Sequence, residues 1–490
     1  MHTRVKYENI YKAVRIPYQK ASQHRSPQVT ITTARTIAYD ALVATIEQNK
    51  KPEEALERLY AKQKKTIKKL DRSFITEILY GSLRWYSKLY WILQNTSNRD
   101  LDKSSGEIKA ALVAGTYQIY YMSKVPDRAA VNESVEYIRA RGQASACSFV
   151  NGILRQIARR GEYFPKPDKI KQPEEYLALQ YAHPRWIVRR WSKQFKFERL
   201  SSMLSNNNQK PPLTIRSNLN NFPIAEIRKL QEELLRTERT HSDKRPLRSA
   251  LRLKEFPSTE TESIFGQGNY TFQDESSQLI GLLVDPNDKE TIVDACAGPG
   301  GKLSHIYELA NKETATKSTI IAIEKSKRQL IRAQETCERL NHKNIEWIES
   351  DFLKWNADQK VDKILLDAPC SGLGVLHRHP EGKWQKTEKA IADIVLMQQK
   401  MLKHALDQLK VGGSLIYSVC SFEIDETTDQ LKWVLETYKD AVEVISPVHL
   451  IPDYYKKYVT RDNILMIYSG NQDQMDGFGA FIVKKVKNFE

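Results

Sequence analysis

The sequence predicts a multidomain protein with an N-terminal all-α bundle, a small α+β middle module and a C-terminal α/β domain with a mostly parallel sheet. Three observations lead to this fold class. The chain has 490 residues, which is too long for one ordinary hydrophobic core. Its first part carries apolar residues at helical spacing. From about residue 286, short apolar runs alternate with helical stretches, a pattern typical of a parallel sheet covered by helices on both faces.

The N-terminal part divides into a basic arm and a helical region. Residues 1–29 are basic and lack the apolar core of a signal peptide, so we expect a short arm there. Residues 30–162 carry a series of amphipathic patterns, beginning at 34–48 and continuing through 71–94. The last pattern ends in basic residues and glycine, a normal helix stop. We expect an all-α bundle that exposes basic residues such as Arg155, Arg159 and Arg160.

Residues 163–285 change character. The stretch PKPDKIKQP indicates a linker, and NNNQKPPLTIRSN indicates a loop that enters a short strand. A further basic stretch, HSDKRPLRSALRLKE, follows. These features predict a small α+β module between the bundle and the C-terminal domain, which covers residues 286–490.

Composition limits the partners and the compartment. The net charge of +16 fits a solvated basic surface or affinity for a polyanion such as nucleic acid equally well. No apolar run approaches the roughly 18 residues that cross a membrane. The five cysteines are widely spaced and form no CxxC pair, which disfavours a disulfide framework and structural zinc. We expect free thiols, no metal, no membrane and a cytoplasmic location.

The C-terminal domain carries five predicted strands, at 291–297, 319–325, 344–350, 362–368 and 413–419. Between the last two lies a helical stretch that begins near Ile391 and is expected to end at Gly412 and Gly413. In such sheets ligands bind beyond the carboxyl ends of the strands.

A glycine-rich turn follows the first of these strands. Glycine lets the backbone approach a ligand closely, and the helix that follows offers free N–H groups. The turn is neither a Walker A loop nor GxGxxG, so a nucleoside triphosphate and NAD fit poorly. A tight turn without a ligand is the plain alternative. The candidate cofactor-binding residues of this turn are Cys296, Ala297, Gly298, Pro299, Gly300, Gly301 and Lys302.

Two acidic residues narrow the choice of cofactor. Glu324 ends the second strand, where a carboxylate can accept hydrogen bonds from both ribose hydroxyls of an adenosine. Asp351 follows the third strand, within reach of an adenine edge. Each residue alone is more typical of a cap or a solvated loop end. With the glycine turn, in this order, they favour an adenosyl ligand without a pyrophosphate, and S-adenosylmethionine fits.

Two cysteines lie at the ends of the fourth and fifth strands. Alone, Cys370 or Cys420 is more often a small buried hydrophobe. Asp367, three residues before Cys370, changes this interpretation. A methyl donor, two thiols and a carboxylic acid suit methylation of cytosine at carbon 5. One thiolate adds to carbon 6, the acid assists at ring nitrogen N3, and the other thiol assists release. The residues by themselves leave open which thiol attacks.

The motifs DACAGPGGK, DAPCSG and SVCS, preceded by YTFQDESSQLIGLLVDP, give residues from about 270 to 490 a resemblance to the NOL1/NOP2/Sun family of RNA 5-methylcytosine methyltransferases. The resemblance implies a Rossmann-like class I methyltransferase domain. It also implies that Cys420 is the nucleophile, that Cys370 is the release residue, and that Asp367 belongs to both the catalytic and the cofactor site. DNA cytosine methyltransferases use the proline-cysteine thiol as the nucleophile instead.

The resemblance extends to the rest of the chain. Residues 124–160 look like a NusB-type RNA-binding bundle, and the stretches YAHPRWIVRRW and GVLHRHPEGKW resemble the RsmB (Sun) branch, which modifies small-subunit (16S) ribosomal RNA. His377, Arg378 and His379 are candidate RNA contacts. The chain departs from the family pattern at Val419, where threonine is frequent, and at Thr427, where asparagine is frequent after the glutamate.

The sequence therefore predicts an S-adenosylmethionine-dependent RNA (cytosine-C5)-methyltransferase that acts on ribosomal RNA. We expect no obligate protein partner, and a monomer. Two alternatives stay open. The substrate could be transfer RNA, or the protein could be a non-catalytic RNA-binding assembly factor whose methyltransferase fold is a relic. The presence of Asp367, Cys370 and Cys420 together with the whole glycine turn argues against a relic.

Overall fold

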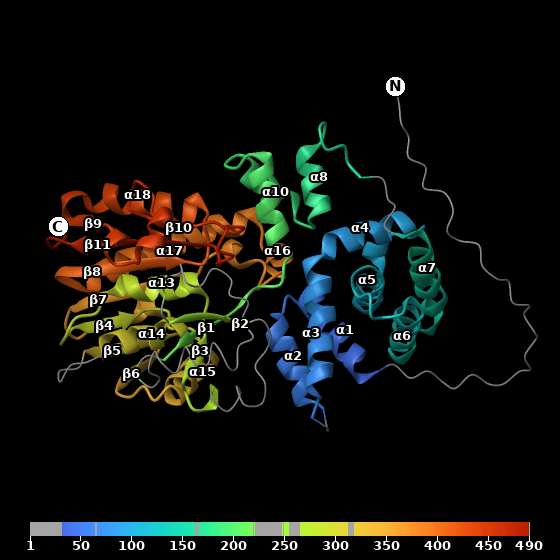
Figure 1. Ribbon diagram of the computed structural model, residues 1–490, viewed down its shortest axis with the longest axis horizontal. Helices are drawn as coiled ribbons and strands as arrows, with labels where there is room; N and C mark the ends of the chain where they lie inside the picture. The colour runs from blue at the N-terminus through green and yellow to red at the C-terminus, as the bar shows by residue number, and fades with distance from the viewer. Residues whose placement is uncertain are drawn as a thin grey trace, which may run out of the picture.

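The computed structural model describes residues 32–63, 66–161, 166–218, 220, 247, 249–253, 265–311 and 318–489. The predicted basic arm, 1–29, and most of the basic stretch 241–255 lie outside these residues. Figure 1 shows the helical bundle, in blue to teal, beside a sheet domain in yellow to red. Among the described residues, no helix combines the length and apolar character that a membrane crossing requires.

The N-terminal domain is all-α, as predicted. Its central helix is α5, whose residues from Ala110 to Gln118 are all buried. The α5 helix begins after Ser105, whose hydroxyl accepts a hydrogen bond from the N–H of Ile108 and so caps the first turn. The pattern at 71–94 forms two helices, because the backbone leaves the helical conformation at Trp85. The helices are α1 (Thr33–Glu47), α2 (Pro52–Ala61), α3 (Lys69–Arg84), α4 (Tyr86–Thr96), α5 (Gly106–Tyr121), α6 (Asp127–Ala140) and α7 (Cys147–Arg160).

The described residues of the middle module form three short helices and a three-stranded antiparallel sheet. The helices are α8 (Pro173–Gln180), α9 (Arg185–Ser192) and α10 (Phe197–Asn206), and the strands are β1 (Leu213–Ser217), β2 (Ala250–Leu253) and β3 (Tyr270–Phe272), in the order β2-β1-β3. Arg216 of β1 is fully buried and forms an ion pair with Glu308, 2.7 Å away. Its guanidinium also donates to the carbonyl of Gly301. The module is thereby fixed to the helix that follows the glycine turn.

The C-terminal sheet contains all five predicted strands, and these are parallel to one another. Three antiparallel strands extend one side, so the sheet is mixed. The strands are β4 (Thr291–Asp294), β5 (Thr319–Glu324), β6 (Ile345–Glu349), β7 (Val361–Asp367), β8 (Leu409–Val419), β9 (Val442–Ile445), β10 (Leu465–Ile467) and β11 (Phe478–Lys485). Their order is β10-β11-β8-β7-β4-β5-β6, and β9 also pairs with β11.

Helices cover both faces of this sheet. Neighbouring residues of a strand point to opposite faces, so each strand supplies apolar side chains to both layers of helices. Val293 and Leu366 pack with residues of α17, α18 and the middle helices, whereas Ile292 and Leu365 pack with residues of α13 and α14. The helices of this domain are α13 (Glu275–Val284), α14 (Gly301–Ala310), α15 (Lys327–Arg339), α16 (Gly382–Gln385), α17 (Glu388–Gln408) and α18 (Thr428–Tyr438). The predicted α/β architecture is confirmed.

The predicted end of the long helix is wrong. The α17 helix ends at Gln408, so Gly412 and Gly413 do not terminate it and lie in β8 instead. The pairing of β7 with β8 is irregular at this point, where the register passes from Leu409 to Ser414. Gly412 has a φ of +89°, a left-handed conformation that glycine adopts without strain. The two glycines therefore serve the strand irregularity.

Candidate active site

The carboxyl ends of β4, β7 and β8 meet at one edge of the sheet. The strand order reverses between β4 and β7, and this is where doubly wound sheets bind ligands. The glycine turn follows β4, Asp367 ends β7, and Cys420 directly follows β8. The structure therefore brings together the glycine turn, the proline-cysteine motif and the second cysteine, which are far apart in the sequence.

The two cysteine side chains are in direct contact. Cys370 Sγ lies 3.1 Å from Cys420 Sγ, and both thiols are half-buried. The hydrogen bond between them lowers the pKa of Cys420 against the effect of burial, and the positive charge of Lys302 acts in the same direction. The same bond raises the pKa of Cys370, and burial raises it further. Because the thiolate is the reactive form of cysteine, the two shifts make Cys420 the more readily ionised thiol of the pair.

Asp367 contacts Lys302, which follows the glycine turn, and Ser418, two residues before Cys420. Its Oδ1 accepts a hydrogen bond from Ser418 Oγ at 2.7 Å, and its Oδ2 is 2.7 Å from Lys302 Nζ. Burial opposes the charge on Lys302, but the carboxylate of Asp367 outweighs it and raises the pKa of Lys302. The sequence placed Lys302 in the cofactor turn; its ion pair with Asp367 was not predicted.

The glycine turn packs tightly against the following elements. Gly300 has a φ of +87°, and a Cβ there would lie 3.0 Å from the Cα of Ala333 in α15. The N–H of Gly298 donates to Glu324 Oε2 at 3.0 Å. A residue with a side chain at position 300 would therefore push the turn away from α15 and disturb the contact with Glu324.

The two predicted adenosine-binding carboxylates stand at the ends of neighbouring strands. Glu324 ends β5, and its second oxygen accepts a hydrogen bond from the N–H of Ser326 at 2.8 Å. Asp351 follows β6, which pairs in parallel with β5, and its Oδ1 accepts from the N–H of Leu353 at 3.0 Å. These backbone bonds fix both carboxylates, and a carboxylate oxygen can accept more than one hydrogen bond.

Two further acidic residues of the site were not predicted as site residues. Asp294 ends β4 and is buried, and burial together with the charge of Asp367 raises its pKa to about 7. Its acidic side chain inside the apolar run TIVDACA was a signal that the sequence offered. Glu426 is also fully buried, and its side chain contacts the residues that follow both cysteines. Its contact with Ser371, 55 positions away, becomes visible only in the folded structure.

The segment that follows Cys370 runs directly into the junction with the bundle. Lys383 is fully buried, and its Nζ donates to the carbonyls of Arg84 and Ala182 and to Asn208 Oδ1, at 3.1, 3.3 and 2.7 Å. Burial and the charge of Arg84 lower the pKa of Lys383 well below its usual range. Trp384 Nε1 donates to the carbonyl of Leu83 at 2.6 Å. These two residues connect the sheet domain with the bundle and the middle module, and α16 lies at that boundary in Figure 1.

The structure corrects the predicted RNA contacts in the same segment. His377 is 3% exposed, and its Nε2 lies 2.9 Å from Asp476, so it is too buried to contact RNA. Arg378 pairs with Asp476 and with Asp274 at the start of α13. His379 remains half exposed, and its role as an RNA contact stays a prediction.

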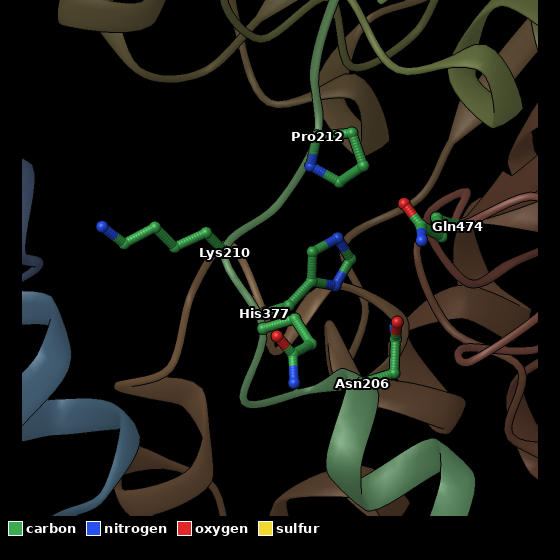
Figure 2. A pocket seen from close by; sticks show the side chains of 6 residues that line it. Asn206, Lys210, Pro212, His377 and Gln474 are labelled. Atoms are coloured by element: carbon green, nitrogen blue, oxygen red, sulfur yellow. The ribbon is translucent and has the colours of Figure 1, made fainter. Parts of the chain in front are cut away.

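A small cavity opens beside His377. It has a volume of about 240 Å³ and is lined by Asn206, Gln209, Lys210, Pro212, His377 and Gln474. Figure 2 shows the imidazole of His377 below Pro212, from the middle module, with Gln474 to its right. Neither Cys370 nor Cys420 lines it, so this cavity is distinct from the cysteine pair.

A mostly parallel sheet with a glycine turn at its carboxyl edge, attached to a helical bundle, is the architecture of a methyltransferase domain with an added helical domain. Three family matches agree with this class. Residues 281–484 match the family described as 16S rRNA methyltransferase RsmB/F, residues 32–159 match the NusB family, and residues 183–260 match the RsmF/B-like ferredoxin-like domain.

The chain belongs to the RsmB/F family of 16S rRNA methyltransferases. It is 31% identical over 461 residues to the probable ribosomal RNA small subunit methyltransferase B of Bacillus subtilis, covering 93% of this chain and 99% of that protein. It is also 31% identical to ribosomal RNA small subunit methyltransferase B of Proteus mirabilis, covering 83% of this chain and 92% of that protein.

Solved structures show the same fold. The crystal structure of PH0851 superposes with a TM-score of 0.75 at 21% identity, covering 94% of this chain and all of that chain. The structure of NSun6 from Pyrococcus horikoshii with SFG has a TM-score of 0.50 at 21% identity, covering 61% of this chain and 97% of that chain.

Proposed function

We propose that the protein is an S-adenosylmethionine-dependent RNA (cytosine-C5)-methyltransferase that modifies a cytosine of 16S ribosomal RNA. The observation that carries this proposal is the contact between Cys370 and Cys420, 3.1 Å apart beside Asp367. Carbon 5 of cytosine is a poor nucleophile, so its methylation needs a thiolate that first adds to carbon 6. A second thiol at contact distance suits the step that releases the product.

The cysteine pair divides the reaction between its members. The thiolate of Cys420 adds to carbon 6, the C5–C6 electron pair shifts toward C4, and N3 takes up a proton. Asp367 would face N3 and pass it this proton. The proton would come from Lys302, whose Nζ is 2.7 Å from Asp367 Oδ2. S-adenosylmethionine, when bound, supplies the methyl group that carbon 5 takes.

Release reverses the addition. The proton on carbon 5 leaves to Cys370, the C5–C6 double bond forms again, N3 returns its proton, and the Cys420 thiolate is expelled. Cys370 must first lose its own thiol proton to solvent. The pKa of Cys370 is raised chiefly by its hydrogen bond to Cys420. That cause disappears once the Cys420 sulfur is bonded to carbon 6, so Cys370 becomes able to act as a base at this stage.

The cofactor residues fit an adenosyl ligand. Glu324 and Asp351 stand at the ends of adjacent strands next to the glycine turn, and backbone N–H groups fix both carboxylates. Glu324 would accept hydrogen bonds from the ribose hydroxyls, and Asp351 would hold the adenine. The turn from Cys296 to Lys302 would hold the methionine part, with its backbone close to the ligand.

The remaining domains would hold the RNA. The bundle exposes Arg155, Arg159 and Arg160 at the end of α7, and such groups neutralise phosphates. We assign residues 30–162 to RNA binding, 163–285 to a module between the bundle and the enzyme, and 286–490 to catalysis. The curated relatives are named as small-subunit ribosomal RNA methyltransferases. Free thiols and this substrate suit a reducing compartment such as the cytoplasm, and a monomer would suffice.

Methylation and trapping test the proposal. The protein is incubated with S-adenosylmethionine and either 16S ribosomal RNA or transfer RNA, and the RNA is sequenced after bisulfite treatment. One protected cytosine in 16S RNA is the expected result. A protected cytosine in transfer RNA alone would show that transfer RNA is the substrate. No protected cytosine in either RNA would favour a non-catalytic assembly factor.

The two serine variants separate the roles of the thiols. Cys420→Ser should lose activity on the order of 10⁴-fold or more, because a hydroxyl barely ionises and forms no adduct. Cys370→Ser should complete methyl transfer and accumulate a covalent RNA complex that survives denaturing electrophoresis and depends on S-adenosylmethionine. Asp367→Asn added to Cys370→Ser should suppress that complex. A stable complex with Cys420→Ser instead would reverse the roles.

A further inference from the structure

The Glu426 carboxylate lies behind the cysteine pair and is fully buried. It ends the short 3-10 helix Ile424–Glu426, which follows β8. One oxygen accepts hydrogen bonds from the N–H of Ser371 at 2.8 Å and from Gln398 Nε2 at 3.1 Å. The other accepts from Ser371 Oγ at 2.5 Å and from Ser421 Oγ at 2.8 Å. Because its surface is covered, Glu426 cannot touch a substrate in this arrangement.

The partners of Glu426 are the direct neighbours of the two thiols. Ser371 follows Cys370 and Ser421 follows Cys420, and the two serine hydroxyls lie 3.2 Å apart. The cysteines are fifty positions apart in the sequence, so a contact of 3.1 Å between their sulfur atoms requires that both loops be fixed to a common point. The carboxylate of Glu426 provides that point.

A second side chain, that of Gln398, also holds the loop that contains Cys370. Gln398 of α17 donates to the carbonyl of Pro369 at 2.9 Å as well as to Glu426. The carbonyl before Cys370 and the N–H after it are therefore both held. Gln430 donates to the Gln398 oxygen at 3.2 Å and orients the amide.

The chemistry of these contacts explains why a carboxylate stands here. Four donors converge on it, and each is neutral. An ionised carboxylate offers acceptor positions on both oxygens, whereas a glutamine would turn an NH₂ group toward other donors. Burying a charge is unfavourable unless hydrogen bonds compensate it, and this site supplies them.

The Thr427 departure from the family pattern does not loosen the loop. Thr427 is buried, and its hydroxyl donates to the carbonyl of Glu423 at 2.7 Å, across the turn that ends in Glu426. The turn is thereby closed by its own residues.

We propose that Glu426 is a positioning residue that holds the loops of Cys370 and Cys420 at the distance at which the two thiols can act on one base. The proposal rests on the assignment of both thiols to the reaction. Its structural part, the distance between the sulfurs, can be tested without RNA.

The test uses phenylarsine oxide, which bonds to two neighbouring thiols with loss of one water and binds a single thiol weakly. We expect the full-length protein to bind it through Cys370 and Cys420, and Glu426→Gln to bind at least tenfold more weakly while each thiol still reacts singly with iodoacetamide. Glu423→Gln is the matched control. Glu423 is a fully buried carboxylate of the same loop, but it accepts from Trp191 Nε1 and Arg190 of α9 and should leave the thiol pair intact. Equal arsenical binding by Glu426→Gln and the unchanged protein would overturn the proposal.

A second readout follows the reaction. With 16S RNA and S-adenosylmethionine, Glu426→Gln should accumulate the covalent complex although Cys370 is present, because a displaced Cys370 no longer takes the proton from carbon 5. Glu423→Gln should not. If Glu426→Gln fails to fold, Ser371→Ala and Ser421→Ala each remove contacts and should weaken arsenical binding about threefold; unchanged binding in both would overturn the proposal. If the variants bind the arsenical as expected but the unchanged protein methylates no RNA, the proposed function is refuted and the positioning role of Glu426 is not.

Discussion

The cysteine pair and the bundle junction lie on one continuous segment, yet they differ in how they are built. At Cys370 the side chain is half-exposed, and neutral donors to Glu426 fix its loop. Thirteen residues later, Lys383 is fully buried, and its partners are mostly backbone carbonyls of other domains. The first region is arranged to present reactive atoms. The second is arranged to remove polar groups from water while it connects three parts of the chain.

This difference decides what a sequence can predict. The proposed reaction requires particular side chains, so its candidate residues Asp367, Cys370 and Cys420 could be chosen from the sequence by residue type and spacing. A domain junction requires only that a side chain fit a distant part of the chain. Every residue has a backbone carbonyl, so the sequence does not show which carbonyls will accept such a hydrogen bond. The stretch GVLHRHPEGKW therefore invited an interpretation as an RNA contact, and the structure places much of it between domains.

The largest effect that separates the two regions is expected at Trp384. Trp384→Ala removes the hydrogen bond to Leu83 and the ring contact with Tyr86, whose centroid is 5.6 Å away. We expect the free energy of unfolding to fall by about 2–4 kcal/mol, in the range of large-to-small changes at packed sites. Urea unfolding followed by tryptophan fluorescence and by limited proteolysis of the bundle measures it.

Cys370→Ser is the control for this prediction. It should change the free energy of unfolding by less than about 1 kcal/mol, since it keeps the side-chain size and a donor. If the serine variant is destabilised as much as Trp384→Ala, the two regions form one cooperative unit, and the contrast between them fails.

Much of the fold could be predicted because periodicity reports burial. All five parallel strands were found, since each contains a short apolar run, and the bundle was found from its helical spacing. Strands β4, β5 and β7 are mostly buried, whereas the edge strand β6 is only partly buried. The break at Trp85 was missed because the apolar pattern continues across it into α4. The early start of β8 at Leu409 was missed because glycine normally ends a helix, and the strand irregularity that uses Gly412 depends on a neighbouring strand.

The site divides in the same way. The sequence placed the cofactor turn, Glu324, Asp351 and the cysteines at one edge, and the structure brings these segments together. It could not supply the Lys302–Asp367 ion pair or the contact of Glu426 with Ser371, because these join residues that are 65 and 55 positions apart.

The next effect concerns the cofactor carboxylates, which belong to the reactive edge and lie away from the junction. Asp351→Asn keeps an oxygen that can accept from Leu353 but loses the charge, whereas Asp351→Ala and Glu324→Ala lose both. We expect the alanine variants to weaken S-adenosylmethionine binding by about 1.5–3 kcal/mol, and Asp351→Asn by less. Calorimetry measures the affinity, and an unchanged unfolding midpoint serves as the control. Unchanged affinity in both alanine variants would show that Glu324 and Asp351 do not bind the adenosine.

The smallest effect tests the charge state of the thiols themselves. The hydrogen bond from Cys370 and the charge of Lys302 lower the pKa of Cys420, whereas the same bond and burial raise that of Cys370. Iodoacetamide reacts with the thiolate, so near pH 7 Cys420 should be labelled first. As the pH rises, the preference should shrink, because Cys370 ionises later and both thiols are then reactive. Cys337, whose pKa burial raises to about 12, is an internal reference that should stay unlabelled.

Mass spectrometry of peptides from pH 6 to 10 gives the labelling rate of each cysteine. We expect Cys420 to be labelled faster than Cys370 at neutral pH, in the direction of the two pKa shifts. Cys370→Ala removes the donor and should slow labelling of Cys420, whereas Cys370→Ser keeps a donor and should preserve most of it. Earlier labelling of Cys370 would contradict the direction of both shifts. The nucleophile would then have to be assigned to the proline-cysteine motif, as in the DNA enzymes.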